Sequence, residues 1–131
     1  MEIETWAANR LAEETGLMLM GGHVDVLDGD GNRLARCHFA DPPFRSPEDG
    51  EISAYPFPFS VADADGKPTR FEAFAVDGRR VIAGTAGYRD DVPAPEMKFK
   101  TRHIVQDADV GIESFVISVV RKPLNDGVAP D

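Results

Sequence analysis

The chain has 131 residues, 42% of them hydrophobic, and its 14 basic and 23 acidic side chains leave a formal charge of −9. This length suits one domain with a single core, and the composition is that of a globular protein, not a disordered one. The acidic balance opposes nucleic-acid binding, which needs a clustered basic surface. No apolar run approaches the roughly 20 residues that span a bilayer. We therefore expect a soluble protein with neither a nucleic-acid nor a membrane partner.

Cys37 is the only cysteine, so the chain can form no internal disulfide and no cysteine-rich zinc cluster. The first residues, "MEIETWAANRLAEETG", are acidic and lack a continuous apolar core, which argues against a signal peptide. These features predict a protein made and assembled in a reducing cytoplasm.

Residues 1–16 have the pattern of a short amphipathic helix. Five residues fall at helical spacing: Ile3, Trp6, Ala7, Arg10 and Leu11. Trp6 and Leu11 are expected to anchor the apolar stripe, and Gly16 is a natural stop because glycine adopts the left-handed conformation easily. A helix of about 13 residues is marginal alone, so it must pack on its own domain or on a neighbouring subunit.

Residues 17–121 change to a β pattern. Apolar and polar residues alternate in short runs around Asp-Gly pairs, as in "TRFEAFAVDGRRVIAGTAGY". In "VGIESFVISVV", the residues Phe115, Ile117 and Val119 lie on one side of the pleat. We count about seven strands and expect an antiparallel β-sandwich or a jelly-roll-like barrel. Residues 122–131 form a C-terminal tail outside this domain.

Two apolar segments are candidate contact surfaces. "YPFPF" alternates proline with aromatics and suits an edge strand or a docking arm, although Phe57 and Phe59 could instead plug one end of the sandwich. The run Leu17–Met20 is apolar on both faces, as expected for a strand covered by the helix or by another subunit. The predicted partner-binding residues are therefore Trp6, Leu11, Met18, Met20, Tyr55 and Phe57.

The stretch "DGDGN" places side-chain oxygens at Asp28, Asp30 and Asn32, as a calcium loop does. Such a loop also needs glycine at its sixth position and glutamate at its twelfth, where this chain has Arg33 and Phe39. Aspartate, glycine and asparagine are also the residues that tolerate positive φ in tight turns. We interpret the stretch as a hairpin turn.

His23 and His38 lie opposite each other if Leu27 pairs with Leu34 across this turn. Two imidazoles there could share a metal ion with Asp25 as a third ligand. The alternative is a pair of polar residues on a half-solvated face, and we favour that interpretation because the register is inferred. No metal site is predicted.

The sequence contains no catalytic motif together with the neighbouring residues and secondary structure that such a motif needs. There is no Gly-x-Ser-x-Gly elbow, and "GTAGY" lacks the lysine and the helix of a phosphate-binding loop. Cys37 and His38 are neighbours on one strand, so they point to opposite faces, and Cys37 is expected in the core with Ala35 and Phe39. We predict a non-enzymatic protein without a cofactor.

Several blocks together resemble a family of small structural proteins of tailed bacteriophages: "VDVLDGDGNRLARCHFADPPF", "TRFEAFAVDGRRVIAGTAGY" and "GIESFVIS". The resemblance extends from Leu17 to Ser118 and consists of turns and core positions. It implies a virion component assembled in the host cytoplasm, most plausibly a homo-oligomeric head decoration or cement protein. Its expected partners are the major capsid protein or other virion proteins.

Two other functions stay open. The same β-domain could serve as a tail, neck or fibre-associated protein. It could also be a carbohydrate- or ligand-binding sandwich, but such sites expose several aromatics on one face. With one tryptophan on the helix and two tyrosines, Tyr55 and Tyr88, that face is hard to build.

Overall fold

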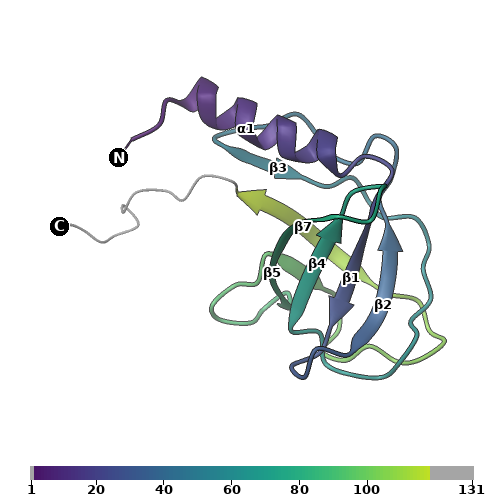
Figure 1. Cartoon of the computed structure of the whole chain (residues 1–131). Coiled ribbons are helices and arrows are strands. Elements are labelled where there is room, and N and C mark those ends of the chain that lie inside the picture. The colour runs from purple at the N-terminus through teal and green to yellow at the C-terminus, as the bar shows by residue number, and fades with distance from the viewer. Residues whose placement is uncertain (1, 119–131) are drawn as a thin grey trace.

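The computed structural model describes residues 2–118 and has one helix and seven strands (Figure 1). The fold is mainly β with a short N-terminal helix, as the sequence predicts. A strongly curved sheet forms the body, and the helix lies across one end of it, above β3. The elements are α1 (Thr5–Met18), β1 (His23–Leu27), β2 (Arg33–His38), β3 (Glu51–Ser53), β4 (Arg70–Phe74), β5 (Arg80–Tyr88), β6 (Met97–Phe99) and β7 (Ile112–Ser118).

The strands form one sheet in the order β2-β1-β4-β5-β6-β7-β3. Every strand ladder in residues 2–118 is antiparallel except that between β5 and β6, which is parallel and pairs Ala86–Tyr88 with Met97–Phe99. The sequence predicted antiparallel pairing throughout, so this ladder is a correction. A parallel pair normally needs a crossover of about a dozen residues. Here residues 89–96 suffice because the ladder is only three residues long.

Both Asp-Gly corners are hairpin turns, which confirms the prediction. In the β1–β2 turn, Asp28 Oδ1 accepts hydrogen bonds from the backbone N–H groups of Asp30 at 2.9 Å and Asn32 at 2.8 Å, and Gly31 has φ 89°. These hydrogen bonds, above all that from Asn32, lower the pKa of Asp28. The oxygens of Asp28 are thus used within the turn. The β4–β5 turn repeats the scheme: Asp77 Oδ1 accepts from Arg79 N–H at 3.0 Å, and Gly78 has φ 90°.

The core lies inside the curved sheet and is rich in aromatic rings. Phe71 and Phe115 meet edge to face with centroids 4.8 Å apart, and Phe39 stacks on Phe115 at 6.3 Å. Phe115 and Ile117 both point inward from β7, as the alternation predicted; Val119 and residues 122–131 lie outside the described part of the chain. Cys37 is buried with Ala35 and Phe39, again as predicted, and burial raises its thiol pKa to about 11.

The N-terminal segment departs from the sequence prediction in two ways. The helix does not stop at Gly16 but continues to Met18, and the backbone after it turns before β1 begins. Leu17 and Met18 are therefore helical, so the run 17–20 is not a strand. Trp6 and Leu11 are exposed and do not anchor the helix to the domain.

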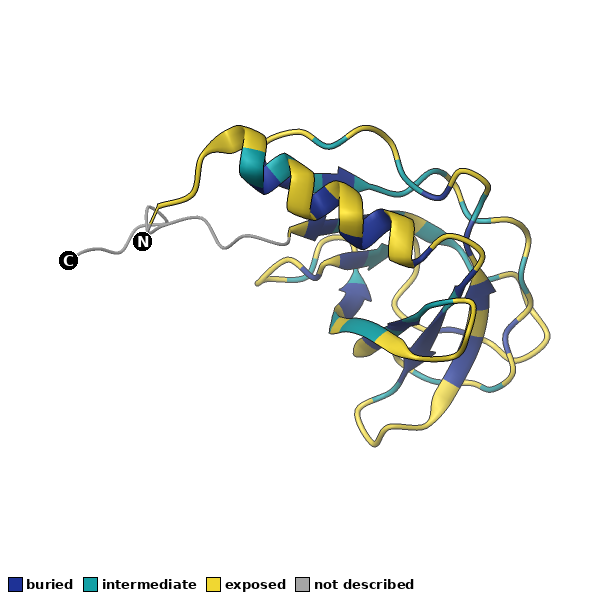
Figure 2. Ribbon diagram, turned by 45° about the horizontal axis from the view of Figure 1, so that its top comes forward, coloured by how far each residue is buried: buried dark blue, intermediate teal, exposed yellow. Residues whose placement is uncertain are grey.

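Small residues hold α1 against the domain instead. The buried residues of α1 are Ala8, Ala12, Thr15 and Gly16 (Figure 2), and the nearest strand is β3. A Cβ atom at Gly16 would lie 3.3 Å from both Ile52 Cδ1 and Phe44 Cδ2, so the helix backbone approaches these side chains closely. Larger residues on this face would push the helix away.

Candidate docking surface

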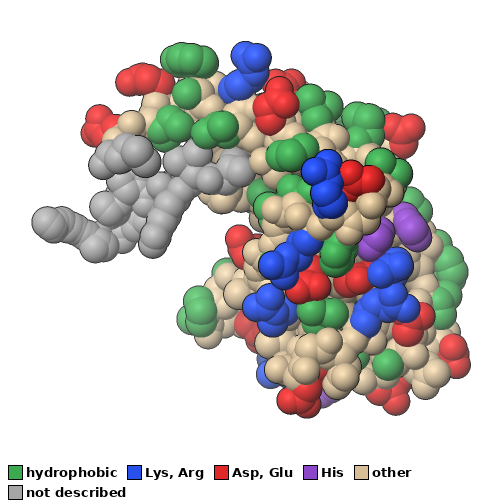
Figure 3. Space-filling model, in the orientation of Figure 1, with side chains coloured by type: hydrophobic (Ala, Val, Ile, Leu, Met, Phe, Trp, Pro, Cys, Tyr) green, Lys and Arg blue, Asp and Glu red, His purple; other side chains and the backbone are tan. Residues whose placement is uncertain are grey.

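The outer face of α1 carries the large apolar side chains of the segment. Trp6 is 70% exposed, Leu17 and Met18 are 52% exposed each, and Leu11 is 48% exposed. Figure 3 shows hydrophobic side chains along the length of the helix. An amphipathic helix normally buries such residues in its own core, so here the usual distribution is reversed. We call Ile3, Trp6, Leu11, Leu17, Met18 and Met20 the outer apolar face.

Helix geometry arranges this face in two rows. Leu11 and Met18 are seven residues apart, which is about two turns, and Trp6 and Leu17 are eleven apart, which is about three. Arg10 and Glu14 lie between the rows and form an i,i+4 ion pair at 3.9 Å. The rows run along a helix of 14 residues, which is about 21 Å long. The exposed surface is therefore elongated.

The surface continues beyond the helix onto the β4–β5 turn. Met18 lines an open groove of about 470 Å³ together with Val76 and Val81. Val76 is 76% exposed, and Arg79 and Arg80 complete the groove. Both arginines are already paired, Arg79 with Asp77 and Arg80 with Glu72. Four of its lining residues are apolar and three are charged, and it adjoins Met18 at the C-terminal end of α1.

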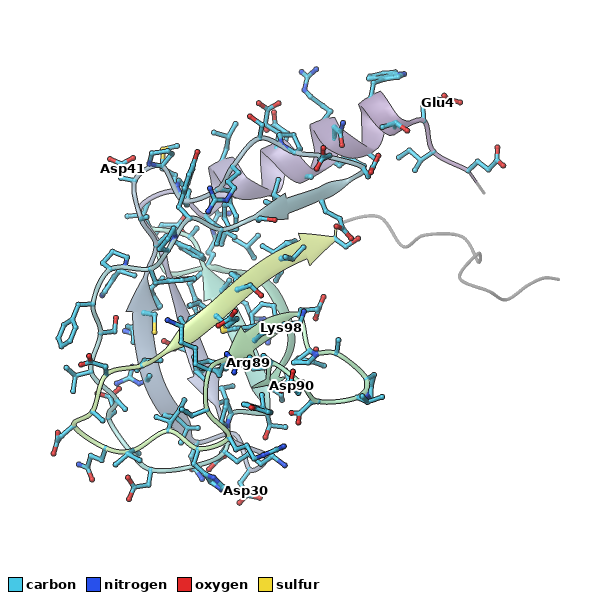
Figure 4. All side chains as sticks on the ribbon, turned by 180° about the vertical axis from the view of Figure 1, so that it is seen from behind. Glu4, Asp30, Asp41, Arg89, Asp90 and Lys98 are labelled. Atoms are coloured by element: carbon cyan, nitrogen blue, oxygen red, sulfur yellow. The ribbon has the colours of Figure 1, made fainter. Side chains whose placement is uncertain are left out.

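Acidic residues surround the outer apolar face. Glu2, Glu4, Glu13 and Glu14 are all exposed, and Arg10 is the one cation in the described part of this segment. Figure 4 labels Glu4 at the start of the helix. Acidic residues outnumber the single cation along the exposed side of α1, and this favours a partner that presents basic residues to it.

The six predicted partner-binding residues do not form one surface. Trp6, Leu11, Met18 and Met20 lie on or directly after α1, as described above. Tyr55 and Phe57 follow β3 and are half-buried. Phe57 packs into the core, 5.4 Å from Phe39 and 6.1 Å from Phe115 between centroids, and "YPFPF" is not a strand. The alternative in which Phe57 and Phe59 plug the sandwich therefore describes Phe57 but is wrong for Phe59, which is 75% exposed.

Ile3 and Leu17 belong to the outer face but are missing from the predicted set. The sequence does contain a signal for them. Ala8, Ala12, Thr15 and Gly16 recur at helical spacing and form a face of small residues, and the opposite side then has to hold Trp6 and Leu17. The prediction that the large apolar residues Trp6 and Leu11 are buried therefore chose the wrong face of the helix.

His23 and His38 are adjacent, as the inferred register required. They are paired between β1 and β2, with ring centroids 5.9 Å apart, although Leu27 pairs with Arg33 because of a local irregularity. Burial, followed by the charge of Arg36, lowers the pKa of His23. This favours the neutral ring.

Asp25 is not available as a third ligand. Its carboxylate accepts two hydrogen bonds from Arg36, at 2.8 and 3.0 Å, and lies 3.9 Å from His23 Nε2. Within residues 2–118 no three His, Cys, Asp or Glu side chains gather closely enough to hold a metal ion. This arrangement suits the interpretation of the histidines as polar residues on a half-covered face.

Comparison of the chain with protein family models, with curated proteins and with solved structures finds no match. No helix in residues 2–118 is long and apolar enough to cross a membrane.

Proposed function

We propose that this protein is a non-enzymatic virion structural protein, a decoration or cement protein that binds the outside of a phage head. One observation carries the proposal. Of the eleven exposed large hydrophobic residues in the described part of the chain, six lie within residues 3–20. They form the outer apolar face, of which every member is at least 38% exposed. Concentrated exposed apolar surface of this kind is typical of protein–protein contact.

Charge indicates the kind of surface that α1 meets. The acids around the outer apolar face favour an apolar groove with Lys or Arg at its rim, into which one face of a helix fits. The resemblance of the Asp-Gly hairpins and of Ser114–Phe115 to small phage structural proteins supplies the location, a lattice of major capsid protein. Repeated docking on such a lattice stabilises the assembled shell by mass action.

The test uses particles. The full chain is mixed with shells that lack it, and its binding is measured by co-sedimentation. We expect the double variant Trp6→Ser, Met18→Ser to bind much more weakly because it loses apolar contact area. Phe59→Ser is the matched control, since Phe59 is 75% exposed but outside the helix. Cryo-EM of the decorated shells should show density for the domain with α1 against the lattice.

Two results would refute the proposal: shells without this density, or equal binding by the double variant and the wild type. A ring of copies at the neck or tail would favour the alternative, a tail-associated protein with the same β-domain.

A further inference from the structure

A second concave surface lies between the segment that follows β3 and the first half of β7. It is a groove of about 420 Å³, half open to solvent. Figure 4 views the molecule from the side on which β7 lies in front. The ladder between β3 and β7 pairs Ser53 with Val116, and one more hydrogen bond joins Ala54 N–H to the Phe115 carbonyl at 2.9 Å. The chain from Tyr55 onward then leaves the strand, which opens the groove.

The groove is on the side of β3 that faces away from α1. Successive residues of a strand point to opposite faces. Ile52 points toward Gly16 of the helix, so Ser53 points the other way, into the groove. The groove and the outer apolar face of α1 are thus separate surfaces.

The lining combines an apolar interior with cations at the edge. Half-buried Phe57 and Ile112 form the apolar part of the lining. The guanidinium carbon of Arg45 lies over the Tyr55 ring, 4.5 Å from its centroid, and Lys100 is exposed in the same groove. A guanidinium flat on a ring keeps its N–H groups free at the edge, where they can bind an anion.

These cations have no anionic partner within the described residues. Seven of the nine arginines in residues 2–118 form ion pairs, as expected in an acidic chain, and only Arg45 and Arg70 do not. Lys100 forms none either. Two cations without an ion pair thus line one groove of a protein whose formal charge is −9. Charged groups in pockets are usually placed to orient a ligand.

We propose that this groove binds an organic carboxylate: an apolar or aromatic body packs on Phe57 and Ile112, and the carboxylate binds Arg45 and Lys100. The exposed side chain of Glu113 also lines the groove and forms an ion pair with Arg89 at 3.6 Å. Its negative charge disfavours a dianion such as a phosphate monoester more than a monoanion. The groove volume is in the range of small-molecule sites, about 300–1,000 Å³.

The test is an NMR titration of the full ¹⁵N-labelled chain with benzoate, with benzamide as the uncharged control of the same shape. We expect saturable shifts in the amides of residues 53–55, 57 and 112–116 with benzoate only. Arg45→Gln and Lys100→Gln should each weaken binding about tenfold, because each removes a charge-assisted contact. Arg70→Gln is the matched control and should leave binding unchanged, since Arg70 is the other arginine in residues 2–118 without an ion pair. Glu113→Gln should tighten binding.

A second arm distinguishes two sources of the same chemistry. A pentapeptide that ends in phenylalanine with a free carboxylate is compared with its C-terminal amide. Tighter binding of the free acid than of benzoate assigns the groove to the chain end of a partner protein, and weaker binding assigns it to a small carboxylate. The proposal is overturned if neither acid gives saturable shifts, if benzamide binds as well as benzoate, or if Arg45→Gln and Lys100→Gln bind like the wild type. Each outcome is independent of whether α1 binds a head lattice.

Discussion

The two faces of α1 differ in a way that opposes the usual rule for amphipathic helices. The inner face consists of Ala8, Ala12, Thr15 and Gly16 and is buried, whereas the outer face carries Trp6 and Leu17 and is exposed. The backbone of α1 can come close to β3 only where the helix side chains are small. The face that is buried is therefore the face with the small residues and not the face with the most hydrophobic ones. Large apolar residues that are not needed for folding remain available for docking. The inner face of α1 is thus built for close packing, whereas the large apolar side chains of the outer face are left exposed.

The largest expected effect comes from filling the inner face. Ala12 is fully buried, so Ala12→Leu forces extra volume into the contact with β3. We expect a loss of about 1–3 kcal/mol in the free energy of unfolding, measured by urea denaturation. Arg10→Leu introduces the same side chain on the outer face and should change stability little. Similar losses of stability in both variants would mean that the inner and outer faces of α1 do not differ in packing.

A smaller loss is expected from the polar contact on the inner face. Asn9 Oδ1 accepts a hydrogen bond from the buried Gly50 N–H at 2.7 Å and ties the helix to the loop before β3. Asn9→Ala leaves that donor unsatisfied and should cost about 1–2 kcal/mol in thermal or urea unfolding. Asn9→Asp keeps an acceptor at this position and should stay close to the wild type. If the alanine variant is as stable as the wild type, the hydrogen bond does not hold the helix.

The histidines also differ in burial, because His23 is half-buried and His103 is exposed. The pH dependence of the free energy of unfolding can reveal this difference. The pKa of His23 is lower in the folded state than in the unfolded state. Below about pH 6.5 the unfolded chain therefore binds a proton at His23 more readily than the folded chain does. This contribution to stability is present above pH 6.5 and is lost as pH falls through the folded pKa. His23→Asn should flatten that part of a stability–pH curve, and exposed His103→Asn should not. Equal slopes in all three proteins would contradict the covered position of His23.

The smallest effect on stability is expected on the outer face. Trp6→Ser and Leu17→Ser should each change the free energy of unfolding by less than about 0.5 kcal/mol, because neither side chain is buried in the domain. Differential scanning calorimetry can check this. A loss above about 1 kcal/mol in either variant would mean that this face supports the fold. Combined with a loss of shell binding, unchanged stability would sharpen the division of roles between the two faces.

The sequence by itself determined the features that depend on near neighbours in the chain. The Asp-Gly corners follow from positive φ and from side-chain hydrogen bonds over two to four residues. Because side chains alternate along a strand, the sequence predicts that one of Phe115 and Val116 points into the core, and Phe115 does. The same alternation predicts the burial of Cys37. The pairing of His23 with His38 stayed open in the sequence: the count from the turn assumed that Leu27 pairs with Leu34, whereas Leu27 pairs with Arg33 and a local irregularity then restores the expected register.

The small residues of α1 mark the face that can approach another element closely, but the approach itself depends on the position of β3, which local patterns do not give. The tertiary structure also decided the parallel β5–β6 ladder, which arises where β6 meets the end of β5 after a short loop. The groove joins Arg45, Tyr55, Lys100 and Ile112, residues that are far apart in the chain and carry no shared motif. Such contacts depend on the packing of whole elements, and no local pattern of residues encodes them.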